Sequence, residues 1–252
     1  MGSIAAPLQR RGRMHNSTTG RVAIVDYGMG NLFSVKEACR EVGLTAEITS
    51  SQQDILNADA VILPGVGAFG DAMNTLDKLD LASVLQEIAA SSKPLVGICL
   101  GMQLLMTESH EFGRHRGLGI IEGEVLRLQV WADGARTLKV PQVGWNRIHE
   151  PDRADPDAGH GPNHIDWDET LLSGLPDGGY LYFVHSFYAS PVDESVVTSI
   201  TKYGPVEFCS SLQFGSVFAC QFHPERSGLQ GLKVYQNLAR SLAGSKAEQS
   251  NE

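Results

Sequence analysis

This sequence is short of basic residues relative to acidic ones, and it is short of long apolar runs. Its 20 lysines and arginines stand against 29 aspartates and glutamates, so the net charge is −9. Because binding of nucleic acid needs a basic surface, this balance argues against a nucleic-acid partner. No apolar run approaches the roughly 20 residues that cross a bilayer, and no apolar segment follows the first arginines as it would in a secretion signal. We therefore expect a cytoplasmic protein with no membrane partner.

Cysteines are also few, and they form no metal-binding pattern. No two of them make a C-x-x-C pair, and no histidine spacing completes a zinc site. The chain also lacks a P-loop and a G-x-G-x-x-G phosphate cradle. The sequence therefore predicts no metal and no cofactor, and it does not require an oxidising compartment. The four cysteines are Cys39, Cys99, Cys209 and Cys220.

The first half of the chain alternates short apolar segments with segments of helical spacing. This order is typical of a parallel sheet with helices on both faces. We expect strands over residues 22–26, 46–49, 58–63 and 94–98, and helices around residues 35–42, 81–90 and 100–106. The fold class predicted is α/β, with an open, twisted, mostly parallel sheet.

The second half is richer in strands with short connections, some of which we expect to be antiparallel. A last helix is predicted over residues 229–242. We expect a disordered tail over residues 1–20, a single domain over 21–243 that contains an inserted loop at 151–166, and a polar tail over 244–252. The alternatives for the first segment are a transit peptide and a translation start at Met14. The predicted strands are residues 124–128, 138–143, 180–184, 196–203, 206–213 and 217–222.

A glycine-flanked cysteine stands where a predicted strand meets a predicted helix, in the segment Gly97-Ile98-Cys99-Leu100-Gly101. Tight strand-to-helix turns that present a nucleophile need small neighbours, because larger side chains clash there. The start of the helix favours a thiolate, and the N–H of Leu100 would lie where an oxyanion develops. A buried structural cysteine in a tight turn is the alternative.

A second candidate segment is Phe222-His223-Pro224-Glu225, which ends an apolar strand. A histidine at the end of a strand can act as general base toward a thiol, and an acid two residues later can orient its ring. Both segments would lie at the carboxyl edge of one sheet, where ligands collect in open α/β folds. On its own, His-x-Glu is more typical of an ordinary surface than of a catalytic site.

Seven segments between residues 21 and 242, the last two of which overlap, carry a resemblance to a known family. They are DYGMGNL (26–32), LPGVGAF (63–69), GICLGMQ (97–103), VGWN (143–146), YFVHS (182–186), QFHPE (221–225) and HPERS (223–227). With these segments the chain resembles the class I (triad) glutamine amidotransferases. It is most similar to the glutaminase subunits that serve a cyclase in histidine biosynthesis.

The resemblance implies that Cys99 attacks the carboxamide of glutamine, that His223 passes the thiol proton to the leaving ammonia, and that Glu225 holds His223. It also implies a heterodimer with a cyclase subunit that uses the ammonia. Further implied roles are Leu100, Gly65 and Val66 as oxyanion donors, Gly67, Gln103, Glu111, His185, Ser186 and Phe187 in the glutamine pocket, and Trp145, Asn146, Tyr182 and Arg226 at the partner interface or ammonia gate.

Three features depart from the family pattern. Gln142 stands where the family usually has a histidine, a usual pair of acids reads His110-Glu111, and the loop at 151–166 is longer than expected. Three alternatives stay open, the first of them because of Gln142. They are a paralogous subunit that feeds ammonia to a different synthase, a silent binding subunit, and a free-standing cysteine hydrolase.

Overall fold

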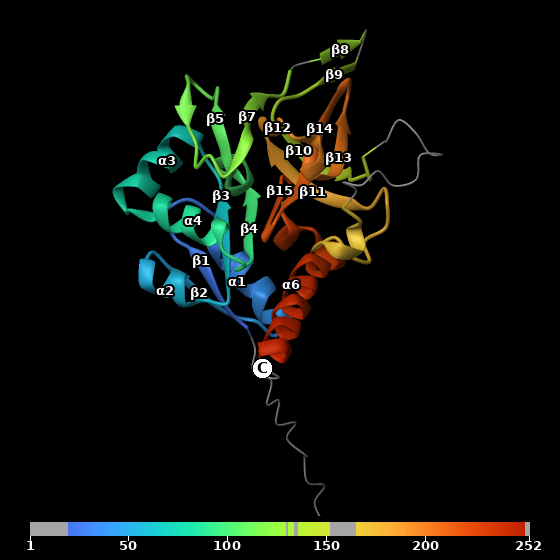
Figure 1. The fold of residues 1–252 in the computed structure, drawn as a ribbon. Helices are drawn as coiled ribbons and strands as arrows, with labels where there is room; N and C mark the ends of the chain where they lie inside the picture. The colour runs from blue at the N-terminus through green and yellow to red at the C-terminus, as the bar shows by residue number, and fades with distance from the viewer. Residues whose placement is uncertain (1–19, 130, 134–135, 152–164, 250–252) are drawn as a thin grey trace, which may run out of the picture.

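The computed structural model describes residues 20–129, 131–133, 136–151 and 165–249. Its centre is a seven-stranded sheet (Figure 1). Five neighbouring strands are parallel, and two more are added at one edge through antiparallel pairing. This arrangement confirms the predicted fold class. In spatial order the strands are β13 (Val197–Tyr203), β14 (Val206–Phe214), β15 (Val217–Cys220), β4 (Leu95–Cys99), β3 (Ala60–Gly65), β1 (Arg21–Val25) and β2 (Thr45–Thr49).

Helices cover both faces of this sheet, and each face has its own core. In β1, Ala23 and Val25 join one core while Val22 and Ile24 join the other. Strands buried on both faces read as continuous apolar runs, which is why they are visible in the sequence. The first core also holds α2 (Gln52–Asn57), α3 (Phe69–Lys78) and α4 (Leu81–Ala90), and the second holds α1 (Leu32–Glu41) and α6 (Gly228–Gln249).

Smaller sheets flank the carboxyl ends of the parallel strands (Figure 1). One has four strands, in the order β12 (Phe187–Pro191), β7 (Ile121–Arg127), β5 (Met106–Ser109) and β6 (His115–Arg116). Two-stranded sheets pair β10 (Gln142–Arg147) with β11 (Tyr180–His185), and β8 (Trp131–Asp133) with β9 (Arg136–Leu138). The short helices are α5 (Leu100–Leu104), η1 (Trp167–Glu169), η2 (Glu194–Val196) and η3 (Pro224–Arg226).

Helix ends differ from the prediction in places. Helix α4 has the predicted bounds, but α5 stops at Leu104 because Met106 begins β5 and pairs with β7. Helix α6 continues past the predicted end at residue 242 as far as Gln249. Helices α2 and α3 were not predicted. For α2 the sequence holds a usable sign, since the side chain of Ser51 accepts a hydrogen bond from the N–H of Asp54, as in an N-terminal cap.

Two predicted segments lie largely outside the described residues, namely 1–19 of the expected tail and 152–164 of the expected inserted loop. Gly20 is buried, and its carbonyl accepts a hydrogen bond from the N–H of Thr45. Among the helices of the described part of the chain, none is both long enough and apolar enough to cross a membrane.

Candidate active site

Cys99 ends β4 in a strained turn at the carboxyl edge of the central sheet. Its φ is +55°, a value that non-glycine residues rarely adopt. The turn is tight because a Cβ on Gly101 would lie 1.8 Å from the carbonyl oxygen of Leu63. A Cβ on Gly97 would lie 3.1 Å from the backbone N of Met102. Glycine is therefore required at position 101 by a close backbone contact, and position 97 leaves little room for a larger residue.

His223 and Glu225 are joined beside this turn. Nδ1 of His223 lies 2.8 Å from Oε1 of Glu225, and the two side chains are 4% and 1% exposed. Burial lowers the pKa of His223, but the neighbouring Cys99 and the bond to Glu225 raise it overall to about 10. Nε2 of the same ring is buried without a hydrogen-bond partner. The second ring nitrogen is thus available for proton transfer at the cysteine.

The other three cysteines are buried in the cores. Burial raises the pKa of Cys39 to about 12, and it also raises the pKa of Cys209 and of Cys220. These thiols remain protonated at neutral pH and are poor nucleophiles. Cys99 differs from them because it acts on His223, whose pKa it raises.

A serine that sequence reasoning did not single out holds the histidine in place. Oγ of Ser227 donates to the carbonyl oxygen of His223 at 2.6 Å and accepts from the N–H of Tyr182 at 2.9 Å. The N–H of His223 in turn donates to the carbonyl oxygen of Tyr182 at 2.8 Å. These hydrogen bonds connect strand β11 to the residues that flank η3. The sign in the sequence was the position of Ser227 at the end of the HPERS segment.

Gln103 reaches the cysteine through a second glutamine. Its Nε2 donates to the carbonyl oxygen of Phe187 at 2.9 Å and to Oε1 of Gln221 at 3.0 Å. Nε2 of Gln221 lies 3.5 Å from Sγ of Cys99. Sequence reasoning missed Gln221, although it lies two residues before His223. The four residues form a buried chain of contacts that ends at the sulfur.

His185 is a neutral buried histidine next to this network. Its Nδ1 lies 2.8 Å from the carbonyl oxygen of Phe187, which can only accept, so Nδ1 carries the proton. Burial, opposed by this bond and helped by the charge of His223, lowers the pKa of His185 to about 4. Its Nε2 is buried without a partner and presents a lone pair. Ser186 is half-buried, and its carbonyl oxygen accepts from the N–H of Leu128 at 2.8 Å.

Glu111 is buried at the start of α3. Its Oε2 accepts a hydrogen bond of 2.6 Å from the N–H of Phe69, so the carboxylate caps a helix N-terminus. The preceding loop carries the predicted oxyanion groups, and Gly65 lies opposite Cys99 in the register of β3 and β4. Val66 is 44% exposed and Gly67 has a φ of +111°. The predicted donor Leu100 is buried directly after the cysteine, at the start of α5.

Three of the four predicted interface or gate residues stack on one another. The rings of Trp145 and Tyr182 are 6.1 Å apart, and Cζ of Arg226 lies 4.6 Å from the ring centre of Tyr182. Trp145 is 55% exposed and therefore not a core residue. Asn146 is instead bound to its own chain, since its Nδ2 donates to the carbonyl oxygen of Lys202 at 3.0 Å.

Gln142, the first departure from the family pattern, is buried in β10 directly opposite His185 in β11. Its Oε1 is without a hydrogen-bond partner. The second departure, His110, lies at the surface beside two glutamates. Of the predicted site residues, the structure therefore brings together the triad, the oxyanion loop, Gln103 and His185, and places Trp145, Tyr182 and Arg226 in one exposed stack.

Comparison with known proteins decides the family. The sequence model described as "Glutamine amidotransferase class-I" matches residues 23–240. The chain belongs to the class-I glutamine amidotransferases. This amidotransferase is 42% identical over 221 residues to imidazole glycerol phosphate synthase subunit HisH of Aquifex aeolicus, with 87% of this chain and 96% of that protein covered. It is 44% identical over 217 residues to the protein of the same name from Moorella thermoacetica, with 86% and 93% covered.

Solved structures support the amidotransferase fold. A protein from Thermoplasma acidophilum, described as a putative component of GMP synthase, superposes with a TM-score of 0.63 at 16% identity, with 94% of this chain and all of that one covered. PurLQS from Thermotoga maritima gives a TM-score of 0.63 at 18% identity, with 89% and 99% covered. At these identities the likeness concerns the fold alone.

Proposed function

We propose that this amidotransferase hydrolyses glutamine to glutamate and ammonia in the cytoplasm, with residues 21–243 acting as one domain. The ammonia goes to a cyclase subunit that makes imidazole glycerol phosphate and aminoimidazole carboxamide ribonucleotide in histidine biosynthesis. The observation that carries the proposal is the turn at Cys99 beside the buried pair of His223 and Glu225. The identity of 42–44% to proteins named as HisH supports the choice of partner reaction.

The chemistry follows from the three side chains. Sγ of Cys99 attacks the carboxamide carbon of glutamine, and Nε2 of His223 delivers a proton to the leaving nitrogen, which departs as ammonia. Water, deprotonated by the same ring, then cleaves the thioester to give glutamate and the free thiol. Glu225 holds the ring through Nδ1 and stabilises its charged form.

The remaining site residues have supporting roles in the proposal. The N–H groups of Leu100 and of the loop at Gly65 and Val66 stabilise the oxyanion, after a peptide rotation that the glycines permit. Gly67, Glu111, Gln103, His185, Ser186 and Phe187 shape the glutamine pocket.

The proposed partner surface is the exposed stack of Trp145, Tyr182 and Arg226, together with Asn146. Because the stack adjoins His223 through Tyr182, docking of a cyclase subunit there would bring the two sites into communication. We expect low glutaminase activity without the partner, since the oxyanion loop is open to solvent at Val66.

Replacing Cys99 with Ala tests the proposal. With the cyclase subunit present, glutamine-dependent synthesis should be lost while synthesis from ammonium salt remains, because only ammonia release needs the sulfur. Survival of glutamine-dependent synthesis would overturn the proposed mechanism. Failure of the unmodified chain to bind or support the cyclase would overturn the proposed partner and point to a paralogous synthase.

A further inference from the structure

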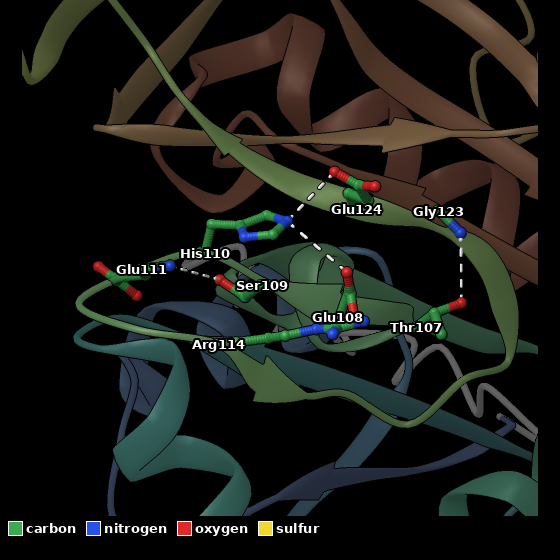
Figure 2. A network of polar contacts seen from close by, with 8 residues as sticks. All are labelled: Thr107, Glu108, Ser109, His110, Glu111, Arg114, Gly123 and Glu124. Carbon is green, nitrogen blue, oxygen red and sulfur yellow. Dashed lines mark hydrogen bonds and ion pairs between the residues drawn. The ribbon is translucent and has the colours of Figure 1, made fainter.

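A second cluster of side chains that can bind a metal lies on the small four-stranded sheet, outside the catalytic groups. Figure 2 shows His110 between two carboxylates, with its Nε2 3.2 Å from Oε2 of Glu124 and 3.6 Å from Oε1 of Glu108. All three atoms lie within 4.8 Å of one another. We propose that Glu108, His110 and Glu124 form a binding site for a divalent transition-metal ion such as Zn²⁺.

The distances from the histidine nitrogen to the two carboxylate oxygens fit a tetrahedral ion. Zinc binds imidazole nitrogen and carboxylate oxygen at about 2.0–2.2 Å, which sets the distance between neighbouring ligand atoms at about 3.4 Å. The two distances from the ring nitrogen of His110, 3.2 and 3.6 Å, lie on either side of that value. One nitrogen and two oxygens also form a donor set that suits zinc better than magnesium or calcium, which prefer oxygen alone.

The charges of the cluster favour a cation. Glu108 on β5 lies directly opposite Glu124 on β7, and facing like charges destabilise a pair of strands. Arg114 neutralises part of the charge of Glu108, because its Nε and Nη2 lie 2.7 and 2.6 Å from Oε2 of that carboxylate. The other oxygen of Glu108 points to His110 (Figure 2). A metal ion held by the three side chains would remove the remaining repulsion.

The cluster is held by its strands and is open on one side. The N–H of His110 donates to the carbonyl oxygen of Val125 at 3.2 Å, which fixes the segment against β7. The side chains of Glu108, His110 and Glu124 are 20%, 47% and 51% exposed. An ion can therefore enter from solvent and keep water in its fourth position, as three-ligand zinc sites do. Two ligands come from one strand and its end and the third from another strand, so no sequence spacing marks the site.

Titration of the full-length, untagged protein with Zn²⁺ by calorimetry tests the site. The Cys99→Ala background is used so that the thiol beside His223 cannot bind the ion. We expect His110→Gln to remove one bound equivalent or to weaken it by about tenfold or more, and Glu124→Gln to have a similar effect. The matched control is His149→Gln, which removes an exposed imidazole that lies beside a single carboxylate, 3.3 Å from Oδ1 of Asp177. It should leave zinc binding unchanged.

Replacing Zn²⁺ by Co²⁺ gives an independent readout. A tetrahedral nitrogen and oxygen site produces visible absorption bands without the near-ultraviolet band of a cobalt–thiolate bond. We expect such bands in the Cys99→Ala protein that serves as the parent, and we expect them to be lost when His110→Gln is added. The inference is overturned if the parent binds neither ion, or if His110→Gln and Glu124→Gln bind both ions as the parent does. It is also overturned if His149→Gln weakens binding as much as His110→Gln.

Discussion

Cys99 ends β4, and the loop after Gly65 follows the neighbouring strand β3. The two regions lie side by side, yet their packing differs. The triad is buried, and the backbone at Gly101 leaves no room for one more carbon atom. In the loop, Val66 is 44% exposed, and the nearest atoms to a Cβ placed on Gly67 lie 3.9 Å away. Atoms whose spacing the chemistry fixes are thus held by the fold, whereas Val66 and Gly67, in the loop that a partner is proposed to switch, lie where the backbone can turn.

The largest effect on glutaminase turnover should come from the carboxylate of Glu225, in the buried triad. Glu225→Gln keeps the size of the side chain but removes the charge that supports the His223 ring. We expect a fall in partner-stimulated glutaminase turnover of about a thousandfold or more. Steady-state kinetics with the cyclase subunit would measure it.

The matched control for this prediction is Glu87→Gln, which removes an exposed acid of α4 outside the site residues. Its turnover should equal that of the parent. If Glu225→Gln retained most of its activity while Cys99→Ala did not, Glu225 would not have the proposed role.

The tightness of the turn can be tested through stability. A Cβ in Gly101→Ala would lie 1.8 Å from the carbonyl oxygen of Leu63, so the strand and the helix must move apart. We expect a loss of about 3 kcal/mol in the free energy of unfolding, measured with urea. Gly244→Ala is the control, because Gly244 lies in α6 with nothing within 4 Å of its added Cβ. That change should be neutral or slightly stabilising.

Acid should lower the free energy of unfolding through the buried side chain of His185. Its pKa is lowered to about 4 in the folded protein, whereas the ordinary value is 6.5. Between these values the unfolded chain binds a proton that the folded chain does not, so stability falls as the pH falls through this window. The contribution of one such group is about 1.4 kcal/mol per pH unit. Urea unfolding between pH 7 and 5 should show a shallower loss in His185→Gln than in the parent, and equal slopes would contradict the shift.

The same contrast explains what could be predicted from the sequence. The doubly buried strands and the glycines around Cys99 are visible because packing leaves few residues that fit there. Gln221 and the cap of α3 by Glu111 could not be predicted, since both depend on contacts between distant segments. The cluster at His110 could not be predicted from the sequence for the same reason, because Glu124 belongs to a different strand. Helix α6 passed its predicted end because the residues after Leu242 include the good helix formers Lys246, Ala247 and Glu248.

The smallest effect, and the sharpest test of the contrast, is expected at Gly67. Its φ of +111° suits glycine, so Gly67→Ala should lower stability by about 1 kcal/mol. Gly43→Ala is a matched control, because Gly43 has a φ of +83° and open space around it but lies far along the chain from the site residues, at the end of α1. Both changes should have a similar cost in urea unfolding. Only Gly67→Ala should reduce the stimulation of glutaminase turnover by the cyclase, by about fivefold, because it hinders the rotation that presents the oxyanion donors. Equal stimulation in the two variants would mean that the open loop is not the part that the partner switches.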